Sequence, residues 1–222
     1  MAIILNIDCS QETASVGIAR DAECIAIRKN ELQADHASWI HTAIQGLLAE
    51  TGISLSDANA IAVTSGPGSY TGLRVGMATA KGLCYALQQP LICVPTLEMM
   101  AYAARNTAAT LICPMIDARR MEVYAAIYDK NLNELVSPEA LVLESTTYHT
   151  YIAAHPVCFI GSGSKKLQGL VQSQHAVFED ILFSVTDMSA LSYKRYLLQD
   201  FASLAYAEPL YIKEFYTAGR RK

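Results

Sequence analysis

Two distant stretches of the chain follow the same pattern, and they constrain the fold more than any other feature. The first reads AIILNIDCSQETASVGIARD and the second reads LICPMIDARRMEVYAAIYD. In each, an apolar run ends in Ile-Asp, and a polar turn, a second apolar run and an aspartate follow. Apolar runs of this length bounded by turns are typical of buried strands. One such pair can arise by chance, but the pattern favours a duplicated chain with domains at 1–106 and 107–222.

The elements expected between these strands alternate as in an α/β protein. In the first half we expect strands over 2–7, 14–18, 23–29 and 60–64, and helices over 37–51, 72–87 and 97–105. Asp35 is placed to cap the first helix, and Gly52 ends it. In the second half we expect strands over 111–117 and 157–160, a glycine turn at 161–163, and helices over 148–154 and 188–201.

A glycine-rich loop, TSGPGSYTGLRVG at residues 64–76, links a predicted strand to a predicted helix. It lacks the lysine of a P-loop, and its order Gly66-x-Gly68-x-x-x-Gly72 is one residue longer than the dinucleotide fingerprint. Backbone amides at a helix N-terminus can still attract an anion. A tight turn that needs glycine's conformational freedom explains the same residues. From spacing alone both interpretations stand.

The helix that follows this loop carries small residues along two ridges. They are Gly72, Gly76, Ala80 and Cys84 on one ridge, and Ala78, Gly82 and Ala86 on the other. Glycine inside a helix costs roughly 1 kcal/mol relative to alanine, so these positions need a compensating role. Close packing inside the domain is one such role, and contact with a second protein is the other.

Candidate catalytic and metal-binding residues are few. Asp8 and Asp117 each end a predicted strand, where they could hold a hydrated Mg²⁺ or simply cap a turn; we favour the turn. His36 and His41 lie five residues apart, which places them on different faces of a helix, so the sequence predicts no metal site there. No spacing suggests a catalytic triad.

Composition narrows the class of protein. The formal net charge is −4, and the one basic cluster is the tail Gly219-Arg220-Arg221-Lys222, so autonomous nucleic-acid binding is not expected. Six cysteines without a C-x-x-C pair suit buried thiols in a reducing compartment. With neither a signal-peptide pattern nor an apolar run of about 20 residues, we expect a cytoplasmic protein that does not enter a membrane.

Three motifs resemble the TsaB family, which is often labelled M22 glycoprotease-like. They are SGPGSYTGLRVG at 65–76, IDARRMEVY at 116–124 and AEPLYI at 207–212. The resemblance spans most of the chain but is poor over 130–205. It implies an α/β fold of two duplicated actin-like (ribonuclease H-like) domains, with mixed sheets flanked by helices. The second domain would be smaller, and the final helix could pack back on the first.

The resemblance also implies a function without catalysis in this chain. TsaB proteins bind and activate the transferase TsaD, which modifies the tRNA adenosine beside the anticodon, and the ATPase TsaE joins them. The chain itself would hold no cofactor, and ATP would be used through the other subunits. Because these first-domain helices also carry spare small and aromatic positions that would be exposed without a partner, we expect two copies to pair through the helices 37–51 and 70–87 when the chain is alone.

The resemblance further assigns roles to individual residues. The predicted partner interface comprises Trp39, Ala43, Gly46, Tyr70, Thr71, Gly72, Arg74 and Gly76. The predicted family-motif loops comprise Gly66, Pro67, Gly68, Asp117 and Arg119. Arg74 is expected to make polar contacts near the interface or to pair within its own domain. The alternative functions are a phosphotransferase of the same fold, for which Gly161-Ser162-Gly163 would be the second nucleotide loop, and an M22-like metallopeptidase.

Overall fold

The computed structural model describes residues 1–30 and 36–213. Two sequence features, the helix cap Asp35 and the basic tail Gly219–Lys222, lie outside the described residues. Among the described helices, none is both long enough and apolar enough to cross a bilayer.

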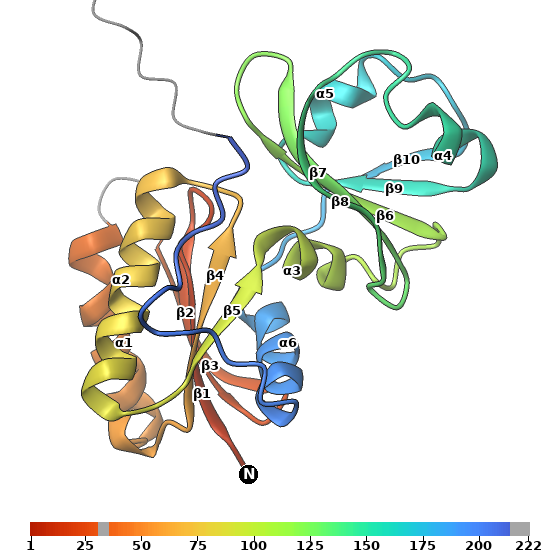
Figure 1. The fold of residues 1–222 in the computed structure, drawn as a ribbon. Coiled ribbons are helices and arrows are strands. Elements are labelled where there is room, and N and C mark those ends of the chain that lie inside the picture. The colour runs from red at the N-terminus through yellow and green to blue at the C-terminus, as the bar shows by residue number, and fades with distance from the viewer. Residues whose placement is uncertain (31–35, 214–222) are drawn as a thin grey trace, which may run out of the picture.

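The strands form two five-stranded mixed sheets with the same internal order (Figure 1). The first sheet has the order β3-β2-β1-β4-β5, with bounds β1 (Ile3–Asp8), β2 (Ala14–Arg20), β3 (Glu23–Asn30), β4 (Ala60–Gly66) and β5 (Leu91–Pro95). The second has the order β8-β7-β6-β9-β10, with bounds β6 (Leu111–Asp117), β7 (Glu122–Asp129), β8 (Glu134–Val142), β9 (Val157–Ile160) and β10 (Ala176–Glu179).

Strand directions repeat as well as strand order. β1 pairs antiparallel with β2 and parallel with β4, and β6 pairs in the same two ways with β7 and β9. The two Ile-Asp strands therefore occupy the central position of their sheets. This repetition confirms the predicted fold class, two duplicated actin-like domains with mixed sheets flanked by helices.

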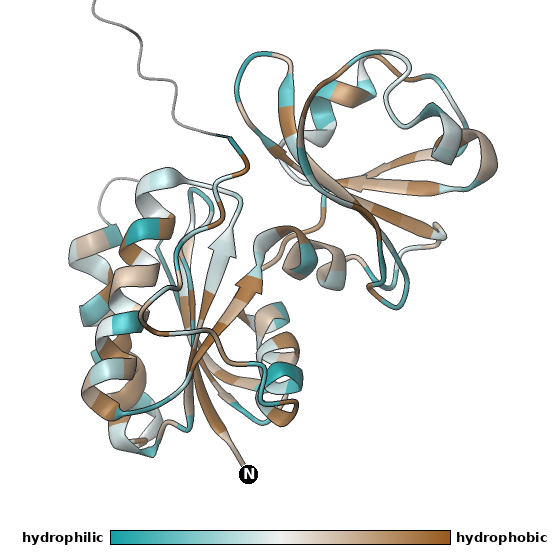
Figure 2. Ribbon diagram, in the orientation of Figure 1, coloured by the Kyte–Doolittle hydropathy of each residue, from teal (hydrophilic) through white to brown (hydrophobic). Residues whose placement is uncertain are grey.

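Helices cover both faces of the first sheet. α1 (His36–Thr51) and α2 (Tyr70–Leu87) lie side by side on one face, and α6 (Val185–Leu197) lies on the other (Figure 1). α3 (Thr96–Ala103) packs against strands of both sheets and joins the two cores. The central strands are almost wholly apolar, as Figure 2 shows, because a sheet covered on both faces has no solvated side.

The second half differs most from expectation. The helix α6 begins at Val185 rather than 188, because Ser184 and Asp187 form a capping box that the sequence analysis missed. β8 and β10 were also missed. The remaining helices are α4 (His149–Ala154), close to expectation, and α5 (Ser164–Gln168), which has only five residues.

A segment after α6 returns across the first domain, and we call residues 198–213 the C-terminal strap. Ala202 forms a bridge with Leu91 at the edge of the first sheet. Lys81 of α2 donates to the carbonyl of Ala207 at 2.9 Å, and the amide of Leu210 donates to the carbonyl of Ser65 at 2.7 Å. The strap therefore ties the end of the described chain to α2 and to the glycine-rich loop.

The two small-residue ridges of α2 have opposite environments. Gly72, Gly76, Ala80 and Cys84 are buried against the sheet, whereas Ala78, Gly82 and Ala86 are exposed. A Cβ on Gly72 would lie 2.1 Å from the carbonyl oxygen of Cys9, but a Cβ on Gly82 would meet nothing within 4 Å. The first ridge thus packs inside the domain, and the second is open.

This difference predicts opposite effects for the same substitution. Gly72→Ala should lower the free energy of unfolding by about 1–3 kcal/mol, because backbone must shift to admit the methyl group. Gly82→Ala should raise it by up to about 1 kcal/mol through helix propensity. Urea denaturation of both variants measures the two values. An unchanged free energy of unfolding for Gly72→Ala would contradict this packing of α2 against Cys9.

Candidate functional site

The glycine-rich loop brings the start of α2 against the connection that follows β1. A Cβ on Gly68 would lie 2.2 Å from the carbonyl oxygen of Ser10, so only glycine allows this approach. The amide of Ser69 donates to that same carbonyl at 2.7 Å. Gly66 has φ +105°, and the Gly66–Pro67 peptide bond is cis. The loop is therefore a backbone-to-backbone contact.

Several amides that an anion would need are already engaged. The amide of Ser69 bonds to Ser10, and the Ser69 side chain caps α2 by accepting from the amide of Gly72 at 3.3 Å. The amide of Leu73 donates to the Ser69 carbonyl, which is the first regular bond of the helix. Of the two interpretations left open by the sequence, this geometry supports the tight turn rather than phosphate binding.

Asp8 lies buried at the end of β1, where its carboxylate is enclosed by hydrogen-bond donors. The Ser10 amide and the Thr64 hydroxyl both donate to its Oδ1 at 2.9 Å. Desolvation raises the pKa of Asp8, although the hydrogen bonds from Ser10 and Thr64 and the charge of His36 act against it. The Ser10 bond is a local Asx turn, as favoured from the sequence.

Asp117 makes the same turn at the end of β6 but is half exposed. Its Oδ1 accepts from the Arg119 amide at 2.6 Å and from Lys166 at 2.5 Å. Desolvation acts to raise the pKa of Asp117, but the bonds from Lys166 and Arg119 outweigh it and hold the pKa below its ordinary value. Both aspartates are thus occupied in turns within their own domains.

Among the described residues, the histidines and the second glycine turn do not form a catalytic or metal-binding site. His36 is half-buried at the start of α1, whereas His41 is exposed. Residues 1–30 and 36–213 contain no cluster of three metal-ligating side chains. At the second glycine turn, a Cβ on Gly161 would lie 2.5 Å from the carbonyl oxygen of Met115, so this turn too is a packing contact and not an open nucleotide loop.

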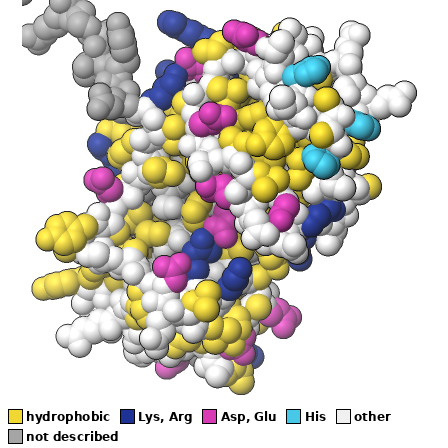
Figure 3. Space-filling view, turned by 45° about the vertical axis from the view of Figure 1, so that its right-hand side comes forward, with side chains coloured by type: hydrophobic (Ala, Val, Ile, Leu, Met, Phe, Trp, Pro, Cys, Tyr) yellow, Lys and Arg dark blue, Asp and Glu magenta, His cyan; other side chains and the backbone are white. Residues whose placement is uncertain are grey.

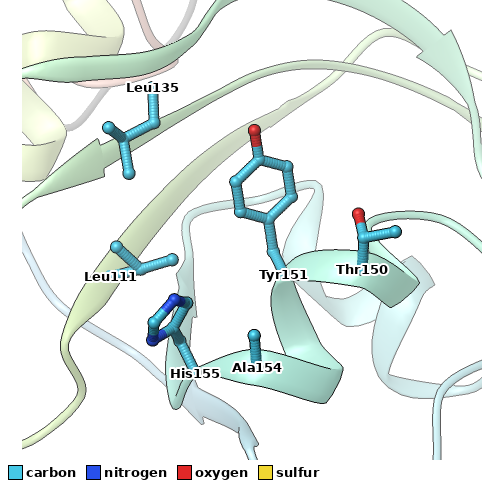
Figure 4. Close-up of a pocket in the computed structure, with 6 residues that line it drawn as sticks. All are labelled: Leu111, Leu135, Thr150, Tyr151, Ala154 and His155. Carbon is cyan, nitrogen blue, oxygen red and sulfur yellow. The ribbon is translucent and has the colours of Figure 1, made fainter.

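One pocket lies in the second domain, well away from the glycine-rich loop. It has a volume of about 310 Å³ and is lined by Leu111, Leu135, Thr150, Tyr151, Ala154 and His155 (Figure 4). These residues come from β6, β8 and the α4 region, so no local sequence pattern indicated it. Its ionisable side chains both come from the α4 region, and no carboxylate lines it to form an acid–base pair.

The predicted partner interface needs correction, because several of its residues face the protein's own sheet. Ala43 is 7% exposed and belongs to the first core, and Trp39 packs against that core. Gly72 and Gly76 lie on the buried ridge of α2, and Gly46 is half-buried near Arg28. The sequence analysis had placed part of the buried ridge on the partner face. Helical periodicity finds two ridges but does not say which one meets the sheet.

The exposed side of the two helices carries few charges: Glu50, which pairs with Arg28, and Arg74 are its exposed charged residues. We define the outer face as Ala37, Ser38, His41, Thr42, Gln45 and Ala49 of α1 together with Thr71, Ala78, Gly82, Tyr85 and Ala86 of α2. Within it Tyr85 is 80% exposed. Solvated helix faces usually carry many charges. Among the predicted interface residues, Thr71 belongs to this face and Arg74 adjoins it.

Arg74 forms a cluster with two tyrosines beside the outer face. Its guanidinium lies 4.0 Å from the centre of the Tyr70 ring, and its Nε donates to the hydroxyl of Tyr211 at 3.0 Å. The two rings lie 5.4 Å apart. Arg74 therefore pairs within its own chain, with the C-terminal strap, and its contact with a partner protein stays a prediction.

Comparison with known proteins agrees with this architecture. A family model described as TsaD, tRNA N6-adenosine threonylcarbamoyltransferase, matches residues 29–208. The tRNA threonylcarbamoyladenosine biosynthesis protein TsaB of Escherichia coli is 31% identical over 218 residues, which cover 95% of this chain and 94% of that protein. The TsaB protein of Bacillus subtilis is 34% identical over 161 residues, covering 71% of this chain and 70% of its own.

A solved structure extends the match to the fold. It is an uncharacterized protein from Pseudomonas aeruginosa with similarity to peptidase YEAZ, 27% identical, with a TM-score of 0.85. The alignment covers 96% of this chain and all of that one. Because sequence and fold agree along nearly the whole length, the chain belongs to the TsaB family of tRNA threonylcarbamoyladenosine biosynthesis proteins.

Proposed function

We propose that this chain is a non-catalytic subunit for threonylcarbamoyladenosine synthesis, which binds a TsaD-type transferase and activates it toward the tRNA adenosine beside the anticodon. The outer face of α1 and α2 is the observation that carries the proposal. Family membership supports the role in tRNA modification, since relatives that cover most of the chain bear that name. A cytoplasmic location fits tRNA modification.

The outer face has the composition of a protein interface. Charged residues are depleted at interface centres, while aromatic residues are enriched there. The exposed ridge Ala78, Gly82 and Ala86 leaves a shallow strip along α2, and Tyr85 stands beside it. A helix of a partner can approach such a strip closely. Two copies of this chain would use the same face, so a homodimer and the heterodimer should compete.

The chemistry is assigned to the partner, because the acidic groups here are occupied structurally. Asp8 is buried and bonded to Thr64 and Ser10, and Asp117 is paired with Lys166. Neither is positioned to activate a substrate. We expect the isolated chain to bind no cofactor, ATP to be used by a TsaE-type ATPase in the complex, and tRNA to be bound by the complex.

Reconstitution tests this function. The TsaD-type transferase, the TsaE-type ATPase, the threonylcarbamoyl-adenylate donor and unmodified tRNA are combined with and without the chain. We expect modified tRNA to accumulate over repeated turnovers only when the chain is present. Equal modification in its absence, or hydrolysis of peptides by the chain alone, would reject the proposal.

The exposed ridge of α2 gives a mutational prediction. Ala78→Glu should leave the thermal unfolding midpoint unchanged, because the side chain points into solvent in the monomer. In the complex it would bury an unpaired charge, which costs several kcal/mol, so the dissociation constant for the transferase should rise at least about tenfold. Isothermal titration with the transferase measures this change.

The control for Ala78→Glu is Ala153→Glu, which places the same charge at an exposed position on α4 in the second domain. It should bind the transferase as the wild type does. If both variants bind normally, the partner does not contact the outer face. Gly76→Glu is unsuitable for this purpose, because a Cβ at Gly76 already contacts Val63 and Cys9.

Asp8 gives a prediction about pH. Its pKa is raised in the folded chain, whereas the unfolded carboxyl has a pKa of about 4. Above pH 4, and up to the folded-state pKa, the unfolded chain binds fewer protons than the folded one. The free energy of unfolding should therefore fall as pH rises through this range. Asp8→Asn should remove that fall and still activate the transferase.

Urea denaturation of the wild type and Asp8→Asn over a series of pH values measures this effect. The amide oxygen of asparagine can accept the same bonds from Thr64 and Ser10, so the variant should fold. An unchanged pH profile would show that Asp8 is not the titrating group. Loss of activation in a folded variant would show that the carboxylate takes part in function.

A further inference from the structure

The turn between β6 and β7 holds two arginines in a backbone conformation that disfavours them. Arg119 has φ +71° and Arg120 has φ +48°. The turn is closed by hydrogen bonds from the Glu122 amide to the Arg119 carbonyl and from the Ala118 amide to the Glu122 carbonyl. Hairpin turns with consecutive left-handed residues normally use Asn, Asp or Gly. Arginine is therefore not explained by the turn itself.

The side chains of these arginines gain nothing from packing. Both residues are exposed, and among the described residues neither guanidinium forms an ion pair. Strained backbone that is retained without a structural benefit is typical of functional sites. The exposed positive charges are the feature that remains to be explained.

Further cations surround the turn, and two of the nearby carboxylates, Asp117 and Glu122, are paired; the exposed Glu144 also lies close, because the Leu143 amide donates to the Met121 carbonyl. Lys166 of α5 binds Asp117, and its Nζ also donates to the carbonyl of Glu122 at 3.2 Å. Lys213 of the C-terminal strap binds the Glu122 side chain. We define the basic patch as Arg119, Arg120, Lys165, Lys166 and Lys213.

Counted with Asp117, Glu122 and Glu144, the basic patch has five cationic side chains and three carboxylates, an excess of two positive charges on a chain whose net charge is −4. In Figure 3 some dark blue side chains lie at the top of the molecule, with magenta side chains among them. The positive charge is therefore concentrated locally on an otherwise acidic protein.

The patch is continuous with the surface assigned to the partner. Lys213 lies two residues beyond Tyr211, which contacts Tyr70 and Arg74 at the start of α2. Figure 1 shows the β6–β7 turn, α5 and the end of the strap on the same side of the molecule. A macromolecule that contacts the start of α2 is therefore also close to Lys213.

We propose that the basic patch contacts the sugar–phosphate backbone of the tRNA bound by the transferase complex; this rests on the function proposed above. Guanidinium groups match phosphate oxygens in a fork geometry, and Arg119 and Arg120 are both exposed. Because the whole chain is acidic, we expect the patch alone to bind tRNA weakly. Its contacts would add to those of a tRNA site on the transferase. Phosphate contacts of this kind carry no sequence preference.

The test exchanges the two arginines for the residues that the turn prefers. Arg119→Asn combined with Arg120→Gly removes both charges and should keep or raise the thermal midpoint. The affinity of the complex for unmodified tRNA should fall several-fold. The slope of log K against log salt concentration should become shallower by about 1–2. Fluorescence anisotropy of a labelled tRNA transcript measures both quantities.

Two controls separate the patch from general charge effects. Arg119→Lys with Arg120→Lys keeps the charges and should keep the salt slope. Arg20→Ala with Lys194→Ala also removes two positive charges, from exposed positions on β2 and α6. This variant should leave tRNA binding unchanged. An equal loss in this second control would contradict the proposal.

The outcomes also separate this proposal from the function above. If the Asn-Gly variant binds the transferase normally but has unchanged tRNA affinity and slope, the patch does not contact tRNA. If it loses the transferase instead, the patch binds protein. If the wild-type chain binds no transferase, the same comparison is made on the chain alone with tRNA at low salt. A smaller change in anisotropy for the variant then supports contact between the basic patch and tRNA. Equal changes for the variant and the wild type reject that contact.

Discussion

The close approach of α2 to the connection after β1 is the constraint on which the first domain depends. Gly68 and Gly72 lie so near the carbonyls of Ser10 and Cys9 that no side chain fits between them. This contact buries one ridge of α2 and turns the other outward. The glycine-rich loop therefore acts through geometry: it fixes which side of the helix is available to a partner.

The duplication explains why similar residues have different environments in the two halves. Asp8 and Asp117 both end a central strand and both accept an amide two residues later. In the first half a long helix follows the glycine turn and the aspartate is buried. In the second half α5 is short, Asp117 is half exposed, and Lys166 reaches it. At the end of the central strand, the first copy thus has a buried aspartate, whereas the second has an aspartate that is paired with a lysine.

The sequence predicted the fold well because strands and their turns are encoded locally, as in the two Ile-Asp stretches. It predicted the ridges of α2 but not their orientation, since that depends on Cys9 and Val63, which are distant in the chain. The C-terminal strap escaped prediction for the same reason: its bonds to Ser65 and Lys81 are long-range. The edge strand β8 is half exposed and lacks a clear apolar run.

The central claim is that the outer face of α1 and α2 meets the transferase, and Tyr85 reports on it directly because its ring is 80% exposed in the free chain. Hydroxyl-radical footprinting compares the oxidation rate of Tyr85 with that of Leu182, which is 88% exposed in the segment before α6. When the transferase is added, Tyr85 should be protected several-fold and Leu182 should not change. Activation of the transferase with undiminished oxidation of Tyr85 would contradict the account.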